Sequence, residues 1–328
     1  MYRKPIESPF HISQLHACLN RISTQAATRQ EVESRYKRSL FGFKGEQSIT
    51  FFLDYLSEEF IIFHNLRLSD KIHHFQIDWL VMCTRFFLII EVKNILGKLT
   101  FDHKLWQLIR ENDGKIDVFD DPMIQANKLQ EQLMKWFNDH ADLSTFPAEN
   151  RVVITSSAQL QTLNSESPLM KNLTRTSAFG TALKKTNQNH IRNCMNRDDL
   201  QAIADQLMDN HTPLILDLFS SFKSLKRTDI IKGVQCPKCR TFCMKRIHRS
   251  WHCFSCDHSS KEAHIPALRD YYLIFGSKIT NKQCRLFLLI DSTDTCRRIL
   301  HSVSLSYSGK NRGRIYNLSH ELLNIRLT

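Results

Sequence analysis

The sequence of residues 76–93 reads QIDWLVMCTRFFLIIEVK. It contains two short apolar, β-rich runs, residues 76–82 and 85–93, which are typical of strands. A similar run at residues 60–63 precedes them, and polar turns such as Ser69-Asp70-Lys71 separate the runs. The three runs therefore predict consecutive strands.

Patterns typical of helices and of further strands surround these runs. From residue 45 to residue 56, apolar residues recur at intervals of three and four, which predicts an amphipathic helix. Asp121-Pro122 offers an N-cap followed by proline at the first helical position, and predicts that a second helix starts there. Residues 98–101 and 151–155 predict two more strands. Residues 41 to about 160 are therefore expected to form an α/β core, a mixed sheet with helices packed against it.

Two charged side chains end the last strand of the opening stretch. Glu91-Val92-Lys93 lies thirteen positions after Asp78. Because side chains alternate along a strand, Glu91 and Lys93 are expected to point to one face of the sheet and Val92 to the other. Burial of an unpaired charge is costly, so charges at consecutive inward positions need a partner such as a metal ion. The alternative is that Glu91 and Lys93 lie on a solvated sheet edge and pair weakly.

Two further polar residues lie in line with apolar positions of the expected helices. Glu46 is expected to open the first helix on the same face as Ile49 and Leu53, although an acid there could merely complement the helix dipole. Gln125 lies one turn into the second helix, in line with Leu129. Its amide could reach the same site, or it could be an ordinary exposed glutamine.

Together, these polar residues supply what phosphodiester hydrolysis requires: Glu46, Asp78, Glu91, Lys93 and Gln125. Two or three carboxylates can hold Mg²⁺ or Mn²⁺, and Mg²⁺ prefers oxygen ligands. The ion would polarise a scissile phosphate and help to generate hydroxide. The ammonium group of Lys93 could orient the attacking water or stabilise developing negative charge.

Two cysteine pairs form the most specific local motif of the chain. Cys236-Pro237-Lys238-Cys239 and Cys253-Phe254-Ser255-Cys256 are separated by thirteen residues, close to the spacing of a zinc ribbon. The pattern predicts a closed tetrahedral site in which Cys236, Cys239, Cys253 and Cys256 hold a structural Zn²⁺. Cys243, His252 and His258 lie near the pairs but outside the pattern, and we do not expect them to be ligands.

The segment between the cysteine pairs is basic. Lys245, Arg246, His248 and Arg249 accompany Trp251, a mixture that suits phosphates and a stacked base. The alternative is a solvated hairpin that is merely basic.

The overall charge favours a polyanionic partner. The chain has 45 Lys and Arg against 33 Asp and Glu, a formal charge of +12, and nucleic acid is the commonest partner of such an excess. No stretch approaches the roughly 20 apolar residues that span a bilayer, so we expect no membrane partner. The first residues do not resemble a secretory signal, and cysteine usage suits a reducing compartment, which predicts a cytoplasmic protein.

Four successive motifs resemble, in order, those of the nuclease-related domain, NERD: Phe43-Lys44-Gly45-Glu46, Gln76-Ile77-Asp78, Ile90-Glu91-Val92-Lys93-Asn94 followed by Gly97, and Asp121-Pro122-Met123-Ile124-Gln125. NERD is similar to the PD-(D/E)xK nuclease superfamily, so the resemblance implies a restriction-endonuclease-like mixed sheet flanked by helices. Two positions depart from the family pattern. Ile77 replaces the proline of the superfamily's name, and Trp79 stands where NERD domains often carry histidine.

The resemblance also implies roles for the five polar residues. Asp78 and Glu91 would be metal ligands, Lys93 the catalytic lysine, Glu46 an auxiliary acid, and Gln125 a residue that completes the site. The predicted function is a metal-dependent nuclease that hydrolyses phosphodiester bonds, in DNA by preference, with the zinc ribbon and the basic C-terminal region aiding nucleic-acid binding. The alternative is a non-catalytic protein that keeps the nuclease-like fold and binds nucleic acid or protein.

The length of 328 residues exceeds the size at which one hydrophobic core usually stops growing, so more than one domain is expected. The predicted parts are a helical basic extension (1–40), a NERD nuclease-like domain (41–160), a helical linker region (161–232), the zinc ribbon (233–260) and a small, largely helical C-terminal domain (261–328).

Overall fold

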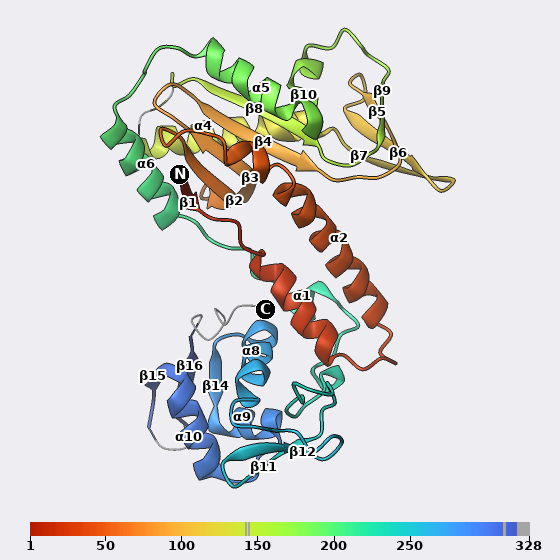
Figure 1. Cartoon of the computed structure of the whole chain (residues 1–328), viewed down its shortest axis with the longest axis vertical. Coiled ribbons are helices and arrows are strands. Elements are labelled where there is room, and N and C mark those ends of the chain that lie inside the picture. The colour runs from red at the N-terminus through yellow and green to blue at the C-terminus, as the bar shows by residue number, and fades with distance from the viewer. Residues whose placement is uncertain (142, 144, 311–312, 320–328) are drawn as a thin grey trace. The chain divides into compact units, whose positions relative to one another are not determined.

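Two compact units make up the structure, a computed structural model that describes residues 1–141, 143, 145–310 and 313–319. Each unit combines two segments of the chain (Figure 1). Unit 1 consists of Met1–Pro9 and Arg38–Leu214, and unit 2 consists of Phe10–Lys37 and Ile215–Thr328. The five-part division drawn from the sequence stays a prediction.

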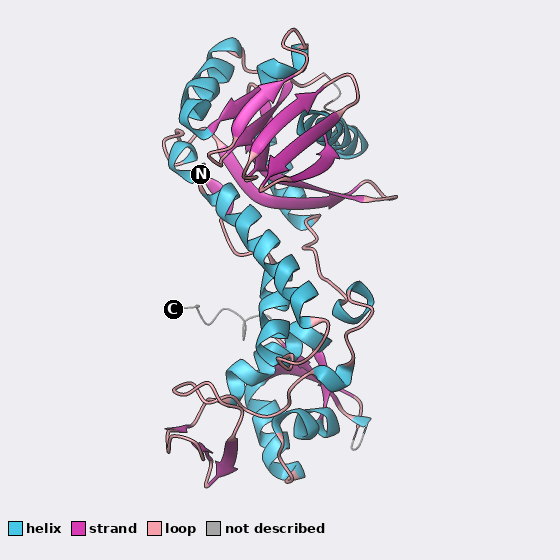
Figure 2. Cartoon of the chain, turned by 90° about the vertical axis from the view of Figure 1, so that its right-hand side faces the viewer, coloured by secondary structure: helices cyan, strands magenta, loops and turns pink. Residues whose placement is uncertain are grey.

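A six-stranded mixed sheet forms the centre of unit 1 (Figures 1 and 2). The inner strands β2, β3 and β4 pair antiparallel, while the β1–β2, β4–β8 and β8–β10 pairs are parallel. In sheet order the strands are β1 (Tyr2–Lys4), β2 (Ile61–Ser69), β3 (His74–Met82), β4 (Phe87–Lys93), β8 (Ala148–Ile154) and β10 (Leu173–Arg175). The sequence prediction of consecutive strands around residues 76–93 is confirmed.

Helices cover both faces of this sheet. On one face, α4 (Pro122–Ala141) and α6 (Arg197–Asp209) share a hydrophobic core with β4 residues such as Phe87 and Ile89. On the other face, α5 (Thr176–Asn189) packs against β4 residues such as Ile90. The predicted α/β class, with a mixed sheet flanked by helices, is confirmed.

The helix expected from residue 45 is wrong in its boundaries. A long helix, α2 (Arg29–Gln47), ends in this region, and the short α3 (Thr50–Leu53) follows it. Ser48 follows the last residue of α2, and its hydroxyl donates a hydrogen bond of 2.7 Å to the carbonyl oxygen of Gly45. Glu46 therefore lies in the last turn of α2 and does not open a helix. The apolar spacing nevertheless identified buried side chains, because Ile49 is fully buried in the hydrophobic core between the sheet and α5.

A second sheet extends unit 1, in the order β7–β6–β5–β9. Its strands are β5 (Lys98–Asp102), β6 (Gln107–Asn112), β7 (Lys115–Asp120) and β9 (Gln159–Thr162). The sequence predicted β5 but not the β6–β7 hairpin, whose outer strand is largely exposed. A short 3₁₀ helix, η1 (Pro168–Asn172), precedes β10.

Unit 2 encloses one hydrophobic core built from helices and two small sheets. Its helices are α1 (Phe10–Arg21), the first part of α2, α7 (Leu218–Ser221), α8 (His264–Phe275), α9 (Asn281–Leu288) and α10 (Thr293–Val303), with the 3₁₀ helix η2 (Arg227–Asp229). One small sheet consists of β11 (Met244–Ile247), β12 (Ser250–Cys253) and β13 (Ser259–Ser260). Of the paired cysteines, Cys253 lies in β12, and Cys236, Cys239 and Cys256 lie outside the strands. The sequence did not predict the other sheet, β14 (Lys278–Thr280), β16 (Ile315–Leu318) and β15 (Ser304–Ser308).

A buried ion pair ties the N-terminal helix of unit 2 to its C-terminal segment. The Nε atom of Arg21 donates a hydrogen bond of 2.7 Å to Oδ2 of Asp270 on α8, and its Nη1 atom donates to the carbonyl oxygens of Ile231 and Gly233. Since an unpaired buried charge is costly, these contacts hold α1 in one position against the core. Among the described residues, no helix is both long enough and apolar enough to cross a membrane.

The end of α2 offers a test of how closely it packs on the sheet. A Cβ atom at Gly45 would lie 2.5 Å from Cβ of Asn94, whereas a Cβ atom at Gly42 on the same helix would meet nothing within 4 Å. Gly45→Ala is expected to lower the free energy of unfolding by roughly 1–3 kcal/mol through overpacking. Gly42→Ala should raise it by up to about 1 kcal/mol, because alanine is the better helix former.

Urea unfolding of both variants beside the wild type measures the difference. Equal or greater stability of Gly45→Ala relative to Gly42→Ala would contradict the close approach of α2 to the end of β4.

Candidate active site and cysteine cluster

The β3–β4 ladder ends at the two acids that the sequence singled out. Paired residues run from Met82 opposite Phe87 to Trp79 opposite Ile90. Asp78 and Glu91 come next in register, but they form no ladder pair. Instead, Oδ2 of Asp78 accepts a hydrogen bond of 2.9 Å from the backbone N–H of Val92. A carboxylate thus replaces a backbone acceptor at the point where the two strands separate.

The β2–β3 ladder is also interrupted beside Asp78. It pairs His64 with Trp79 and Leu66 with Ile77, and it omits the pair between Asn65 and Asp78. Asn65 has a φ of 52°, in the left-handed region that asparagine tolerates better than most residues. The register of the pairs is the same on both sides of the gap, so pairing is interrupted at Asn65 and Asp78 without an extra residue in either strand. Asp78 therefore lies between two irregularities, one toward each neighbouring strand.

Glu91 and Lys93 form an ion pair on the face of β4 opposite to Val92. The Nζ atom of Lys93 lies 2.6 Å from Oε1 of Glu91, whose residue is only 8% exposed. Val92 belongs to the hydrophobic core on the other face, which includes Trp79. Because β4 lies between β3 and β8, the pair is not at a sheet edge, and the solvated-edge alternative is wrong.

The charges of this cluster perturb one another. Burial, followed by the negative charges of Glu91 and Glu46, raises the pKa of Asp78 well above its ordinary range. Burial alone would lower the pKa of Lys93, but the carboxylates of Glu91, Asp78 and Glu46 outweigh it and raise that pKa. Lys93 is thus a cation held among three acids, and the negative charge of the acids is only partly offset.

Glu46 is held beside the cluster by residues of β2 and β3. Its Oε2 atom lies 2.8 Å from Nε2 of His64, which is 0% exposed, and its carbonyl oxygen accepts a hydrogen bond of 3.1 Å from the indole N–H of Trp79. Lys4 on β1 donates a hydrogen bond of 2.7 Å to the carbonyl oxygen of His64. Burial lowers the pKa of Lys4 to about 8, although Glu7 and Glu46 oppose the shift.

The sequence analysis missed His64 and Lys4. His64 follows Ile62 at a core-facing position of β2, and a polar residue at such a position is the feature that could have identified it. No comparable pattern marks Lys4, because its strand has only three residues.

Gln125 lies half-buried in the first turn of α4, which begins after Asp121 as predicted. The Oδ1 atom of Asp121 accepts a hydrogen bond of 2.8 Å from the N–H of Met123. Within the described residues, no hydrogen bond or ion pair joins the side chain of Gln125 to the acids or to Lys93. The structure thus gathers Glu46 and the residues of β3 and β4, and the role of Gln125 stays a prediction.

The donor set suits a hard divalent cation. The carboxylates of Glu46 on α2, Asp78 on β3 and Glu91 on β4 act on one another. Burial, together with the charges of Glu91 and Glu46, raises the pKa of Asp78 although Lys93 opposes the shift. Mg²⁺ takes one or two carboxylates, keeps several waters and prefers oxygen ligands. Asp78 and Glu91 are the residues that could hold it.

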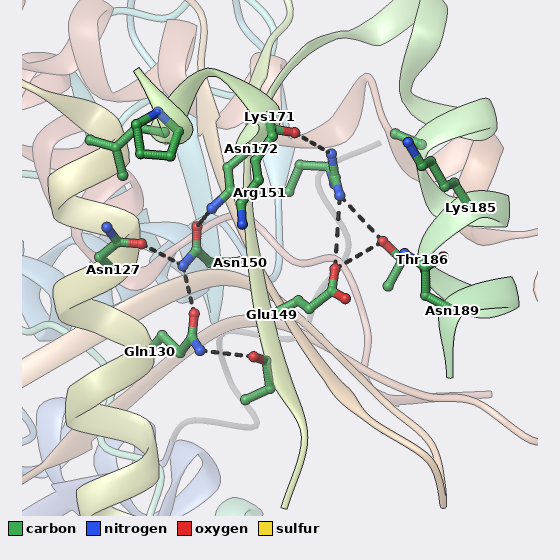
Figure 3. A pocket seen from close by; sticks show the side chains of 14 residues that line it. Asn127, Gln130, Glu149, Asn150, Arg151, Lys171, Asn172, Lys185, Thr186 and Asn189 are labelled. Atoms are coloured by element: carbon green, nitrogen blue, oxygen red, sulfur yellow. Dashed lines mark hydrogen bonds and ion pairs between the residues drawn. The ribbon is translucent and has the colours of Figure 1, made fainter. Parts of the chain in front are cut away.

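A separate hollow of about 560 Å³ lies beside the N-terminal half of β8 (Figure 3). Asn150 donates to the side-chain oxygens of Asn127 and Gln130, at 2.8 and 2.6 Å, and accepts a hydrogen bond from Asn172. These amides largely satisfy one another, as buried polar networks must. None of the residues that line this hollow belongs to the acid cluster.

The four cysteines of the two pairs converge in unit 2. The Sγ atoms of these cysteines all lie within 4.8 Å of one another: Cys236, Cys239, Cys253 and Cys256. The Cys239–Cys253 and Cys236–Cys256 sulfur distances are 3.5 and 3.7 Å. A tetrahedral Zn²⁺ site with bonds of about 2.3 Å places its sulfurs about 3.8 Å apart. The cluster can therefore hold a structural metal such as zinc.

The surroundings of the cluster favour a thiolate at Cys253, whereas at Cys256 a backbone hydrogen bond at His258 is outweighed by burial and the neighbouring thiols, which raise the pKa of Cys256 to about 12. Burial alone would raise the pKa of Cys253, but backbone N–H groups and neighbouring thiols outweigh it and lower that pKa to about 5. Cys243 is a close neighbour, with its Sγ atom 3.4 Å from that of Cys253, yet it lies outside the converging group.

Trp251 does not offer a surface to a nucleic-acid base. It is 0% exposed, and its indole N–H donates a hydrogen bond of 3.1 Å to Nδ1 of His264 inside the core of unit 2. The interpretation of Trp251 as a stacking residue is wrong, because a buried ring cannot stack on a ligand. An exposed aromatic residue of the ribbon is Phe254, which is 59% exposed. The Nζ atom of Lys245 lies 5.5 Å from the centroid of its ring.

Unit 1 belongs to the class of α/β domains that carry a carboxylate–lysine cluster where central strands diverge. Residues 41–155 match the family model described as the nuclease-related domain, NERD. The match includes Glu46, Asp78, Glu91, Lys93 and Gln125, and it supports the resemblance inferred from the motifs. The cysteine cluster lies outside it.

Comparison with solved structures shows a similarity to the crystal structure of protein VC1899 from Vibrio cholerae. The similarity has 13% sequence identity and a TM-score of 0.28, and it covers 57% of this chain and 58% of that chain. This chain thus spans well under two thirds of the length of that protein. None of the curated proteins compared with the chain matches it.

The electrostatics of Asp78 predict a stability change. Because the pKa of Asp78 in the folded state lies above its ordinary value of 3.8, the folded state loses stability as the pH rises from that value through the raised pKa. Asp78→Asn removes this penalty and can still accept the hydrogen bond from Val92. The melting temperature at pH 7 without added Mg²⁺ should rise by about 2–4 °C for each kcal/mol relieved.

Thermal unfolding between pH 4 and pH 8 measures this effect, and Glu111→Gln, an exposed acid on the second sheet, is the control that should not change. A melting temperature of Asp78→Asn equal to or below that of the wild type at every pH would refute the buried-charge account.

The cysteine cluster predicts a specific pattern of metal loss. Cys236→Ser should reduce zinc from about one ion per chain to little or none and should lower thermal stability, because three thiolates cannot close the site. Cys243→Ser should keep the ion, although this sulfur touches Cys253. Metal analysis of the purified variants checks both, and full zinc retention in Cys236→Ser would rule out the four-cysteine assignment.

Proposed function

We propose that the chain is a metal-dependent nuclease that hydrolyses phosphodiester bonds of nucleic acid, with DNA as its preferred substrate and Mg²⁺ or Mn²⁺ as its cofactor. The single observation that carries the proposal is the gathering of Asp78, Glu91 and Lys93 where β3 and β4 separate. The match of residues 41–155 to the nuclease-related domain supports it. Membership of the PD-(D/E)xK superfamily is part of the same proposal.

Each residue of the cluster has a task in this reaction. Asp78 and Glu91 hold the cation, which when bound polarises the scissile phosphate and acidifies a water molecule. The ammonium group of Lys93, held beside Glu91, would stabilise the charge that develops on the phosphate. Glu46, oriented by His64, accepts a hydrogen bond or proton from the attacking water. Gln125 completes the site.

Unit 2 binds the nucleic-acid substrate. A structural Zn²⁺ in the cysteine cluster fixes the ribbon, whose Lys245 and exposed Phe254 face solvent together. Salt-dependent contacts between such cations and phosphates, with stacking on an exposed ring, hold single strands without sequence preference. None of the ten cysteines forms a disulfide and four of them converge on a metal site, which suits a reducing compartment, and we place the activity in the cytoplasm.

Cleavage assays test the proposal. The purified chain is incubated with plasmid, single-stranded DNA and RNA, with Mg²⁺, with Mn²⁺ and without added metal. Glu91→Gln and Lys93→Ala are each expected to reduce the metal-dependent rate by roughly 10²-fold or more, because each removes a group that acts on the transition state.

The matched controls are Glu111→Gln and Lys98→Ala, which remove an exposed ion pair of the same residue types from the second sheet and should leave the rate unchanged. Cleavage that persists in Glu91→Gln and Lys93→Ala would defeat the proposal. Tight binding without cleavage in any metal would support the alternative, a non-catalytic binding protein.

A further inference from the structure

A basic pocket of about 550 Å³ lies in unit 2, between the β11–β12 hairpin and helix α10. Its lining includes three arginines and two histidines: Arg246, Arg249, Arg298, His248 and His264. None of the described residues that line it is acidic. The pocket therefore has a high density of positive charge, whereas many residues that line the hollow of unit 1 carry side-chain amides.

The arginines of this pocket are not neutralised by the protein. No ion pair of Arg246, Arg249 or Arg298 occurs within the described part of the chain. The Nε atom of Arg246 is buried without a hydrogen-bond partner. The nearest acid on α10, Asp294, pairs instead with Arg297, which does not line the pocket. Arg246 and Arg298 each donate one hydrogen bond to a backbone carbonyl oxygen, of Lys261 and of Asp294, and each keeps further N–H groups for an anionic ligand.

The hairpin turn gives an independent reason to assign a function to this pocket. Ile247 pairs with Ser250, so His248 and Arg249 form a two-residue turn. Their φ angles are 42° and 68°, and positive φ at both positions defines a type I′ turn. Such turns strongly prefer Asn-Gly, because a β-carbon is disfavoured at positive φ. The backbone alone does not explain His-Arg at these positions, whereas side chains that contact a ligand would.

The charge of the pocket does not depend on its buried histidine. Burial, together with the nearby Arg246, lowers the pKa of His264 to about 4, and its Nδ1 atom accepts the hydrogen bond from Trp251. His264 is therefore a neutral imidazole at pH 7. The fixed positive charge comes from the arginines, whose planar guanidinium groups bind phosphate oxygens in pairs.

We propose that this pocket binds a phosphomonoester at the end of a nucleic-acid strand, together with the nucleotide that carries it. A phosphodiester inside a strand carries one negative charge, whereas a terminal monoester carries about −1.5 to −2 at neutral pH and better matches three arginines. The volume suits a nucleotide more than an isolated ion. The inference rests on the proposed nucleic-acid substrate, and it adds that unit 2 recognises strand ends.

Equilibrium binding of the full chain, loaded with zinc, tests this assignment. Fluorescence anisotropy compares single-stranded oligonucleotides of one sequence that carry a 5′-phosphate, a 3′-phosphate or hydroxyls at both ends. The Lys93→Ala background without added Mg²⁺ excludes cleavage. One of the phosphorylated ends is expected to bind about tenfold tighter than the hydroxyl form.

Two variants remove the preference if the assignment is right. Arg298→Ala deletes one guanidinium group, and Arg249→Asn deletes another while keeping a residue that favours the type I′ turn. Arg297→Ala is the matched control, because Arg297 lies next to Arg298 on α10 but forms an ion pair with Asp294. It should retain the full preference for a phosphorylated end.

Equal binding of phosphorylated and hydroxyl ends by the parent chain would overturn the inference. A uniform loss of affinity for all three oligonucleotides in Arg298→Ala would also overturn it, by assigning the pocket to internal phosphates. Because binding is measured without cleavage, a chain that prefers phosphorylated ends but never cuts would refute the proposed nuclease activity and leave this inference standing.

Discussion

The hydrogen bond from the backbone N–H of Val92 to the carboxylate of Asp78 is the constraint on which the active-site geometry depends. In a regular antiparallel ladder a carbonyl oxygen would take this N–H. Here a side chain takes it, so β3 and β4 can separate without leaving a buried donor unpaired. Separation at this level leaves Asp78 and Glu91 as neighbours without a ladder pair, and it allows charged groups to collect in the middle of a sheet.

Such a collection opposes stability, and the surrounding packing holds it in place. Three acids share one lysine, and the raised pKa of Asp78 shows that the balance remains unfavourable. His64 contacts the carboxylate of Glu46, and Trp79 donates a hydrogen bond to its carbonyl oxygen. Because Gly45 has no side chain, the end of α2 can pack against Asn94, the residue after Lys93. Shifted pKa values of this kind are common where a protein must bind a cation or stabilise a charged transition state.

Local patterns in the sequence predicted the features that local chemistry decides. The strands around Asp78 and Glu91, the start of α4 at Asp121-Pro122 and the convergence of the cysteine pairs all follow from alternation, capping and spacing. The errors concern contacts between distant segments. The end of α2 packs against Asn94, Trp251 donates its indole N–H to His264, and Lys4 donates to His64 across sixty positions. No short pattern records such contacts.

The composition of unit 2 from both ends of the chain has a consequence for synthesis. Helix α1 buries Leu15 and Leu19 in a core whose other buried residues, apart from Ile22 and Val32, come from Leu218 onward, among them those of α8 and α10. When α1 leaves the ribosome most of its partners do not yet exist, whereas the segments of unit 1 are complete earlier. The nascent chain must therefore carry an exposed apolar helix through most of translation, and a chaperone that shields such helices would shape its yield in the cell.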